Sequence, residues 1–114
     1  MPPTVFDRIL SGEIPAPRVH EDEHCIVIRD INPQAPVHLL VIPRKAIATI
    51  DDASEADKAL LGHLTWVAAQ VARREGLAAD GYRLVWNCRS NGGQEVPHIH
   101  LHVLGGRQMK WPPG

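Results

Sequence analysis

Two kinds of hydrophobic pattern recur along the chain, and they predict different elements. Short apolar or alternating runs bounded by turn-forming residues are typical of β-strands, and they occur at residues 18–20, 25–29, 37–42, 82–88 and 98–104. One longer stretch has apolar residues at helical spacing, namely Leu60, Leu64, Val67, Ala68 and Val71. Ser54, paired with Asp57, is a capping signal for this helix, and Gly76 is a stop signal. The patterns therefore predict five strands and one long helix.

Capping and turn residues near the N-terminus add a short helix and a hairpin. Thr4 and Asp7 form a capping pair for a helix over residues 5–10, which Gly12 ends. The acidic turn at 21–23 joins the first two strands. Strands mostly linked by hairpins, together with one long helix, indicate an α+β domain built on a five-stranded antiparallel sheet.

Composition places the chain among ordinary soluble globular domains. Its 114 residues fit one domain, 1–114, with 44% hydrophobic and 22% charged residues. A net charge of −1 with interspersed acids and bases argues against nucleic acid or a membrane as the main partner. Cys25 and Cys88 lack Cys-x-x-Cys spacing, so we expect free thiols in a reducing compartment. Since the N-terminus shows no targeting pattern, we expect the cytoplasm, and also the nucleus if the source is eukaryotic.

His98, His100 and His102 alternate with aliphatic residues, and this run is the most informative feature of the sequence. Strand side chains alternate with a period of two, so the pattern predicts that all three imidazoles share one face. Three histidines on a rigid element make a poor core. They are typical of a functional site.

Spacing alone leaves four interpretations of this run open. The imidazoles could be solvent-facing residues of an edge strand, zinc ligands, part of a nucleotide-binding module without turnover, or groups that carry out phosphoryl chemistry. The strand rise separates the Cα atoms of His98 and His102 by about 13 Å, whereas a ligating imidazole nitrogen lies about 2.1 Å from zinc. The three histidines therefore do not easily share one ion, although His38 could be a further ligand.

Phosphoryl chemistry explains why several ionisable imidazoles gather in one place. An unprotonated imidazole is a neutral nucleophile, so it can approach an anionic phosphate without charge repulsion. Crowding disfavours simultaneous protonation, so one ring can attack while another contacts phosphoryl oxygens or protonates the leaving group. The nearby segment 92–94, Gly-Gly-Gln, fits this interpretation because glycines let backbone N–H groups approach phosphate closely.

The segment 98–104 resembles the signature of the histidine triad (HIT) family, His-x-His-x-His followed by two apolar residues. Segments 30–43, 92–95 and 105–114 resemble the Hint branch of that family, so the resemblance covers essentially the whole chain. It implies a HIT-like fold and a homodimer whose two sheets join across the interface, with 105–114 as a C-terminal tail. It also implies a purine nucleotide substrate, without a cofactor or a metal.

The activity that the resemblance implies is hydrolysis of the P–N bond in adenosine 5′-phosphoramidates, which releases AMP and an amine; hydrolysis of aminoacyl-adenylates is a related activity. His100 would attack the phosphorus and form a nucleotidyl-histidine intermediate. The His98 carbonyl would orient His100, and His102 and His38 would flank the phosphate. The alternative is a purine-nucleotide-binding interaction protein with incidental turnover.

The resemblance also implies roles around these histidines. Asp30 would bind the ribose hydroxyls, although it could simply form a turn before Asn32. Phosphate-side and leaving-group-side positions would be Asn87, Gly93, Gln94 and Glu95, and the base pocket would hold Val5, Phe6, Ile9, Ile28, Ile31 and Leu40. Trp111, in the tail, is a large apolar residue that we expect to pack on a second subunit. The histidines outside the site, His20, His24 and His63, are expected to face solvent.

Overall fold

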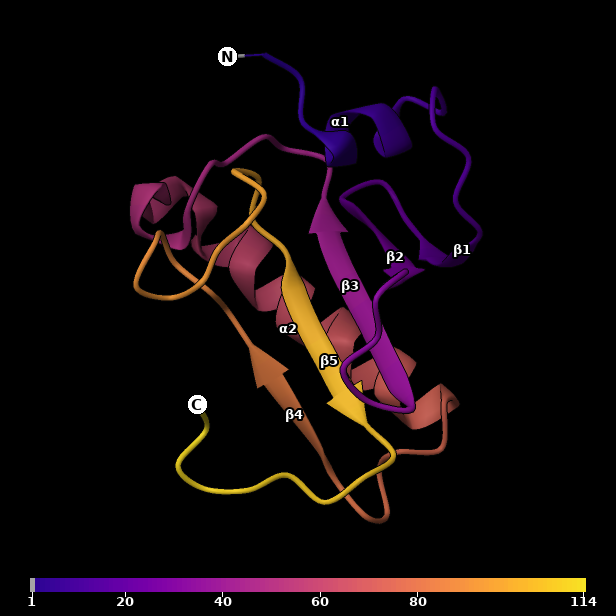
Figure 1. Ribbon diagram of the computed structural model, residues 1–114. Helices are drawn as coiled ribbons and strands as arrows, with labels where there is room; N and C mark the ends of the chain where they lie inside the picture. Colours follow the sequence, from indigo (N-terminus) through magenta and orange to yellow (C-terminus); the bar gives the residue numbers. More distant parts are fainter. Residues whose placement is uncertain (1) are drawn as a thin grey trace.

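The computed structural model describes residues 2–114 and has the predicted architecture. Its strands are β1 (Arg18–Glu21), β2 (Cys25–Arg29), β3 (Val37–Pro43), β4 (Tyr82–Val85) and β5 (Leu101–Gly105), and its helices are α1 (Val5–Leu10) and α2 (Lys58–Arg74). The strands form one sheet in the order β1-β2-β3-β5-β4, and all neighbouring pairs are antiparallel (Figure 1). The predicted α+β class, with a long helix and a short N-terminal helix, is confirmed.

Both predicted capping pairs form. Around α1, the Asp7 amide donates to the Thr4 hydroxyl over 3.2 Å, and the Thr4 amide donates to the Asp7 carboxylate over 2.8 Å. Before α2, Ser54 and Asp57 form a second capping box. That box encloses a single 3₁₀ turn, Glu55–Asp57, so the α-helix proper begins at Lys58, one turn later than the capping signal suggests.

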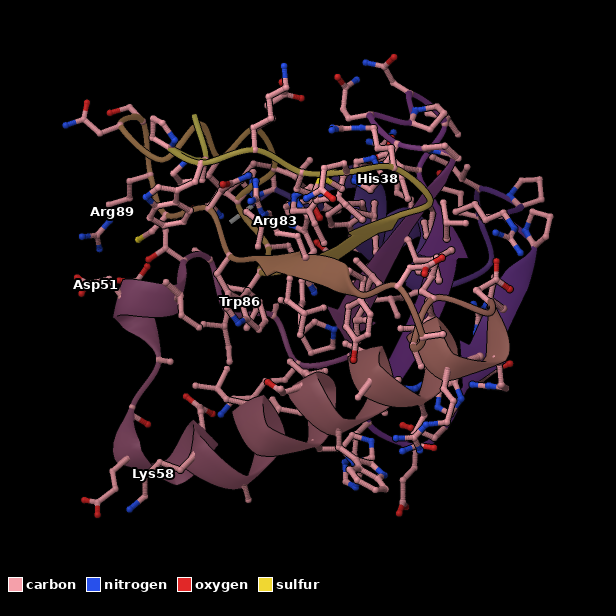
Figure 2. All side chains as sticks on the ribbon, turned by 90° about the horizontal axis from the view of Figure 1, so that it is seen from below. His38, Asp51, Lys58, Arg83, Trp86 and Arg89 are labelled. Carbon is pink, nitrogen blue, oxygen red and sulfur yellow. The ribbon has the colours of Figure 1, made fainter. Side chains whose placement is uncertain are left out.

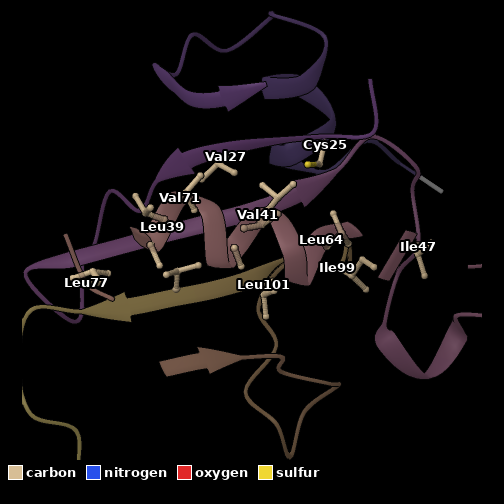
Figure 3. Close-up of a cluster of buried hydrophobic side chains, with 14 residues drawn as sticks. Cys25, Val27, Leu39, Val41, Ile47, Leu64, Val71, Leu77, Ile99 and Leu101 are labelled. Carbon is tan, nitrogen blue, oxygen red and sulfur yellow. The ribbon is translucent and has the colours of Figure 1, made fainter. Parts of the chain in front are cut away.

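The two faces of the sheet are covered by different helices. Helix α2 crosses one face, where a large apolar cluster includes Cys25, Val27, Leu39, Val41, Leu64, Val67, Ala68, Val71, Leu101 and Val103 (Figure 3). Helix α1 covers part of the other face, where a smaller cluster holds Phe6, Ile9, Ile26, Ile28, Leu40 and Ile42. Since successive strand residues point to opposite faces, the even-numbered residues of β3 and β5 share the α1 face.

Strands β4 and β5 are shorter than the sequence predicts. The predicted run 98–104 becomes strand only from Leu101, because the residues before Leu101 do not make their backbone hydrogen bonds to β3. The Ile99 amide donates to the carbonyl of Ile47 over 2.8 Å, and β3 ends at Pro43, which has no N–H to donate. Strand β4 pairs only with β5, and its Val85 lies opposite His102. In this register residues 87 and 88 would lie opposite His100 and Ile99, which precede β5, so the predicted strand does not extend to Cys88.

Two histidines that were expected to face solvent are engaged in contacts. His20 Nε2 lies 2.8 Å from Oδ2 of Asp22, and His63 Nε2, on α2, lies 2.9 Å from the same oxygen. His24 is exposed, as predicted. The expectation fails for His20 and His63 because Asp22, in the β1–β2 turn, reaches a helix that follows it by some forty residues in the chain.

The cysteines are free, as predicted: among the residues described, Cys25 is buried and Cys88 is half-buried, without a disulfide. No helix between residues 2 and 114 combines the length and the apolar character of a membrane span.

Candidate active site

A cavity of about 620 Å³ opens on the α1 face of the sheet, beside α1, β2, β3 and the segment that leads into β5. Most of the residues that the sequence singled out line it: Val5, Phe6, Ile9, Ile28, Asp30, Ile31, His38, Leu40, Asn87, Gly93, Glu95, His100 and His102. Four further residues line it without a signal of their own in the sequence, namely Arg29, Asn32, Gln34 and Val96. The fold thus gathers in one cavity residues from four separate segments.

His100 lines this cavity with a defined tautomer. Its Nδ1 lies 2.8 Å from the carbonyl oxygen of His98. A carbonyl can only accept, so Nδ1 carries the proton and Nε2 of the neutral ring holds a lone pair. Burial lowers the pKa of His100 below the ordinary 6.5, although the bond to the His98 carbonyl opposes this. At neutral pH the ring is an uncharged nucleophile.

A chain of hydrogen bonds fixes the tautomer of His102. The Gln34 amide donates to Nδ1 of His38 over 3.0 Å, so the His38 proton sits on Nε2. That Nε2 lies 2.9 Å from Nδ1 of His102, which must then accept. The remaining nitrogen of His102, Nε2, therefore carries its proton. The cavity thus contains one imidazole with a lone pair at Nε2 and a neighbouring imidazole with an N–H donor at Nε2.

Both supporting histidines are uncharged at neutral pH. Burial, together with the charges that His100 and His38 would carry, lowers the pKa of His102 to about 4. Burial also lowers the pKa of His38, although the Asp30 carboxylate partly offsets this effect. The ring centroids of His100 and His102 are 4.9 Å apart, so a positive charge on one disfavours a charge on the other.

His98 does not share the position of the other two histidines. Its ring is 1% exposed, and its Nε2 donates to the carbonyl of Pro43 over 2.8 Å. Within residues 2–114 its Nδ1 has no hydrogen-bond partner and lies 3.7 Å from a carboxylate oxygen of Asp7. The ring centroid of His98 lies 6.1 Å from that of Phe6 in α1, so His98 is on the α1 side with the other two histidines, as the alternation predicts. Its ring is buried outside the cavity, however, and the group that contacts His100 is its backbone carbonyl.

Asp30 is shared between a turn and the cavity. Its Oδ1 accepts from the Asn32 amide over 2.8 Å, which is the turn geometry foreseen as the alternative role. Its Oδ2 lies 3.5 Å from Nε2 of His38. Ligand atoms of Asp30, His38 and His102 lie within 4.8 Å of one another, a spacing that could hold a metal ion. The hydrogen bonds just described already account for this grouping without one.

The glycine loop at 89–94 uses its amides internally. The Gly93 amide donates to Ser90 and the Gln94 amide donates to Arg89, each over 3.0 Å. These two N–H groups are not free for phosphate, contrary to what the glycine pair suggested. The loop is so tight that a Cβ on Gly92 would lie 2.6 Å from backbone atoms of Cys88, while Gly93 has φ +75°.

Gln94 holds the loop in place through side-chain hydrogen bonds and does not line the cavity. Its side-chain amide donates to the carbonyls of Ala48 and Val96 over 2.7 and 2.9 Å, and its oxygen accepts from the Arg89 amide. The Arg89 guanidinium in turn contacts Asp51 over 2.9 Å, and Figure 2 shows the two side chains together at one end of the molecule. The loop that carries Gly93 and Glu95 is thereby anchored to the segment before α2.

Helix α1 supplies part of the apolar side of the cavity through Val5, Phe6 and Ile9. The Phe6 ring meets His100 edge-on, with centroids 4.8 Å apart. Ile31 is fully exposed at the cavity edge, and Trp111 is 83% exposed, outside the cavity-lining residues. In this single chain, the residues that line the cavity include none of the tail, 105–114, and Figure 1 shows the tail beside β4.

Of the unforeseen lining residues, Gln34 matters most, because its backbone amide sets the tautomer of His38. A side-chain pattern cannot reveal a backbone donor. The only available signal was its position in the turn before β3, within the segment 30–43 that resembles the family.

Comparison with known proteins identifies the family. The HIT domain family matches residues 11–109. A solved structure of a HIT family hydrolase from Legionella pneumophila superimposes with a TM-score of 0.94 at 57% identity, covering 96% of this chain and 98% of that one. An uncharacterised HIT-like protein of Synechococcus elongatus is 50% identical over 111 residues, 97% of this chain and 96% of its own. The 14 kDa zinc-binding protein of Zea mays is 52% identical over 114 residues, 98% of this chain and 88% of its own. The chain belongs to the HIT family.

Proposed function

We propose that the protein is a purine nucleoside phosphoramidase, which hydrolyses the P–N bond of adenosine 5′-phosphoramidates through His100. The observation that carries the proposal is the tautomer pair in the cavity. His100 holds a lone pair at Nε2, and His102 holds an N–H at the equivalent position. The hydrolase named in the closely similar Legionella structure supports a hydrolytic activity in general.

The reaction follows from these two nitrogens. Nε2 of His100 attacks the α-phosphorus and forms a P–N bond, while the bond to the substrate amine breaks. The bonding pair leaves with the amine nitrogen, which takes up a proton from solvent. The Nε2–H of His102 donates a hydrogen bond to a phosphoryl oxygen, where negative charge increases during the attack. A water molecule then attacks the phosphorus, the bond between phosphorus and Nε2 of His100 breaks, and one water proton returns to solvent, which gives AMP and neutral His100. No step requires a metal ion.

The remaining lining residues suit a nucleoside. Phe6, Ile9, Ile28 and Leu40 supply an apolar wall for a purine, and Asp30 can accept from ribose hydroxyls with the lone pairs that the Asn32 amide and His38 leave unused. Glu95 lies on the cavity lining, where its carboxylate suits a cationic amine leaving group better than a phosphate. Hydrolysis of aminoacyl-adenylates would use the same phosphorus-centred step.

We also propose a homodimer, with Trp111 of the tail packed on the second subunit, because a tryptophan that is 83% exposed in one chain leaves a large apolar surface in water. Sedimentation at micromolar concentration tests it: a dimer is expected, and a monomer would contradict the assembly. A cytoplasmic location is the simplest proposal for a protein with free thiols.

Release of AMP from an adenosine phosphoramidate tests the activity. The wild-type chain should turn over with or without a chelator, and His100→Ala should lose at least about 10³-fold in kcat, because removing a nucleophile removes the whole covalent route. Mass spectrometry of quenched wild-type reactions should show the nucleotidyl adduct on His100.

The rival function is a purine-nucleotide-binding interaction protein with incidental turnover. It predicts that AMP binds tightly while His100→Ala retains the wild-type rate. Loss of turnover with chelator, while the protein stays folded, would instead indicate a metal at Asp30, His38 and His102, and would overturn the mechanism proposed here.

A further inference from the structure

A second cluster of ionisable side chains lies on the opposite face of the sheet from the cavity. Its centre is Oδ2 of Asp22, in the β1–β2 turn. His20 Nε2 lies 2.8 Å from this oxygen, His63 Nε2 lies 2.9 Å from it and Cys25 Sγ lies 3.6 Å from it. Cys25 belongs to the core beneath α2, and His20 is paired with Val27 of the same core. The cluster therefore faces α2, whereas the catalytic histidines face α1.

We propose that His20, Asp22, Cys25 and His63 form a binding site for a zinc-type transition-metal ion. Imidazole, carboxylate and thiolate are the ligand types of tetrahedral zinc. Zinc–ligand bonds of 2.0–2.3 Å place neighbouring ligand atoms of a tetrahedron roughly 3.3–3.6 Å apart. Ligand atoms of His20, Asp22 and Cys25 already lie within 4.8 Å of one another, and His63 touches the central carboxylate from α2.

The site is built mainly by one hairpin. Asp22 is held by two backbone donors, since the amides of His24 and Cys25 donate to its Oδ1 over 2.7 and 2.9 Å. Those bonds leave Oδ2 to meet the imidazoles and the thiol. Three ligands from residues 20–25 and one from α2 would clamp the hairpin to the helix. The expected role is structural, because the site lies across the sheet from His100.

Metal binding changes the protonation of the ligands in a defined way. The thiol proton of Cys25 leaves to solvent, and each imidazole must present a lone pair at Nε2, so its proton moves to Nδ1. Arg74 now donates to Nδ1 of His20 over 3.1 Å, and this contact has to break. Arg74 is exposed, so its side chain can turn into water. Removing its charge with Arg74→Gln should tighten metal binding.

Cobalt titration of the full chain, after dialysis against a chelator, tests the site. Co²⁺ occupies zinc sites, and a Co²⁺–thiolate bond gives a near-ultraviolet charge-transfer band. We expect one equivalent of Co²⁺ to produce this band, and zinc to abolish it. The histidine and carboxylate grouping around His102 contains no sulfur, so cobalt bound there cannot give the band. Cys88→Ser is the matched control and should keep it.

Three variants decide the ligand set. Cys25→Ser should lose the band, and His63→Gln and His20→Gln, which keep the thiol, should each weaken Co²⁺ binding at least ten-fold. The two histidine variants also serve if Cys25→Ser does not fold, since both side chains are partly exposed. The proposal fails if the wild type gives no band, if the band persists in Cys25→Ser, or if both histidine variants bind as the wild type does. In those cases the cluster is a hydrogen-bonded carboxylate only.

Discussion

The two faces of the central strands carry opposite chemistry from adjacent residues. On the α2 face, Leu101 and Leu39 are buried in a continuous apolar core. On the α1 face of the same strands, His102 and His38 form part of a chain of defined protonation. Strand side chains alternate between the two faces of a sheet, so a residue that packs in the core is followed by one that lines the cavity. The same strands thus contribute apolar side chains to the core on one face and polar side chains to the cavity on the other.

The substitutions with the largest expected effects should each act on one face of the sheet, either on stability or on turnover. Leu101→Ala removes a buried side chain from the α2 face and should lower the free energy of unfolding by about 2–5 kcal/mol, measured by urea denaturation. Its kcat, measured well below the unfolding transition, should change little. An equal loss of kcat would show that the core and the site do not act separately.

His102→Ala should give the converse result. Without the Nε2–H donor on the phosphoryl oxygen, kcat for the phosphoramidate should fall about 10²–10³-fold, the range for a single oxyanion donor. The free energy of unfolding should change far less than in Leu101→Ala, since His102 is partly exposed. If His38→Ala, which removes the partner that fixes this tautomer, leaves kcat unaffected, the hydrogen-bond chain has no role in turnover.

Lowering the pH should destabilise the protein through the α1 face. The folded-state pKa of His102 is about 4 and those of His38 and His100 are also lowered, whereas an unfolded histidine titrates near 6.5. Between these values the unfolded chain binds protons that the folded chain does not, so the free energy of unfolding falls as the pH falls from 6.5 to 4. Denaturation at pH 7 and pH 5 measures this loss.

Two variants calibrate that pH dependence. His102→Asn should reduce the difference between the two pH values, because one of the depressed pKa values is gone. Leu101→Ala should lower stability equally at both. A pH difference unchanged in His102→Asn would place its origin elsewhere.

The smallest expected effect comes from weakening helix α1, which lines one side of the cavity. Thr4→Ala removes the cap of α1 and should cost about 1 kcal/mol. Because α1 holds Phe6 against His100, KM for the nucleotide should rise more than kcat falls. Ser54→Ala, which removes a cap on the α2 side, should leave KM unchanged and is the matched control.

The sequence predicts most of the fold because its signals are local. The Thr4–Asp7 cap and the 18–29 hairpin depend on neighbours within a few residues. The ends of β4 and β5 do not, because they depend on whether a partner strand extends far enough. The hydrogen bond from the Ile99 amide to the Ile47 carbonyl joins residues 52 positions apart, and no local pattern in either segment predicts it.

The site is predictable to the same extent. The segments that resemble the HIT family identified the side chains around the cavity, and the orientation of His100 by the His98 carbonyl agrees with the structure. The burial of the His98 ring outside the cavity and the bond from the Gln34 amide escaped prediction because they depend on the path of the backbone. The contact between Asp22 and His63 was not predicted for a related reason. In the sequence each resembles an ordinary surface residue, and the two meet only because α2 packs against the β1–β2 hairpin.

The carbonyl that orients His100 belongs to the main chain. Every amino acid at position 98 would supply the same oxygen, so side-chain replacement there cannot delete it. A scanning mutagenesis of the three histidines would therefore report the loss of the hydrogen bond from the His98 ring to the Pro43 carbonyl and would miss the contribution of the His98 carbonyl to His100. Replacing the peptide link between residues 98 and 99 with an ester makes the same carbonyl a poorer acceptor and would test this contribution, and it also removes the Ile99 N–H that donates to Ile47. The hydrogen bond that orients His100 thus cannot be removed by side-chain substitution but can be weakened by chemical synthesis.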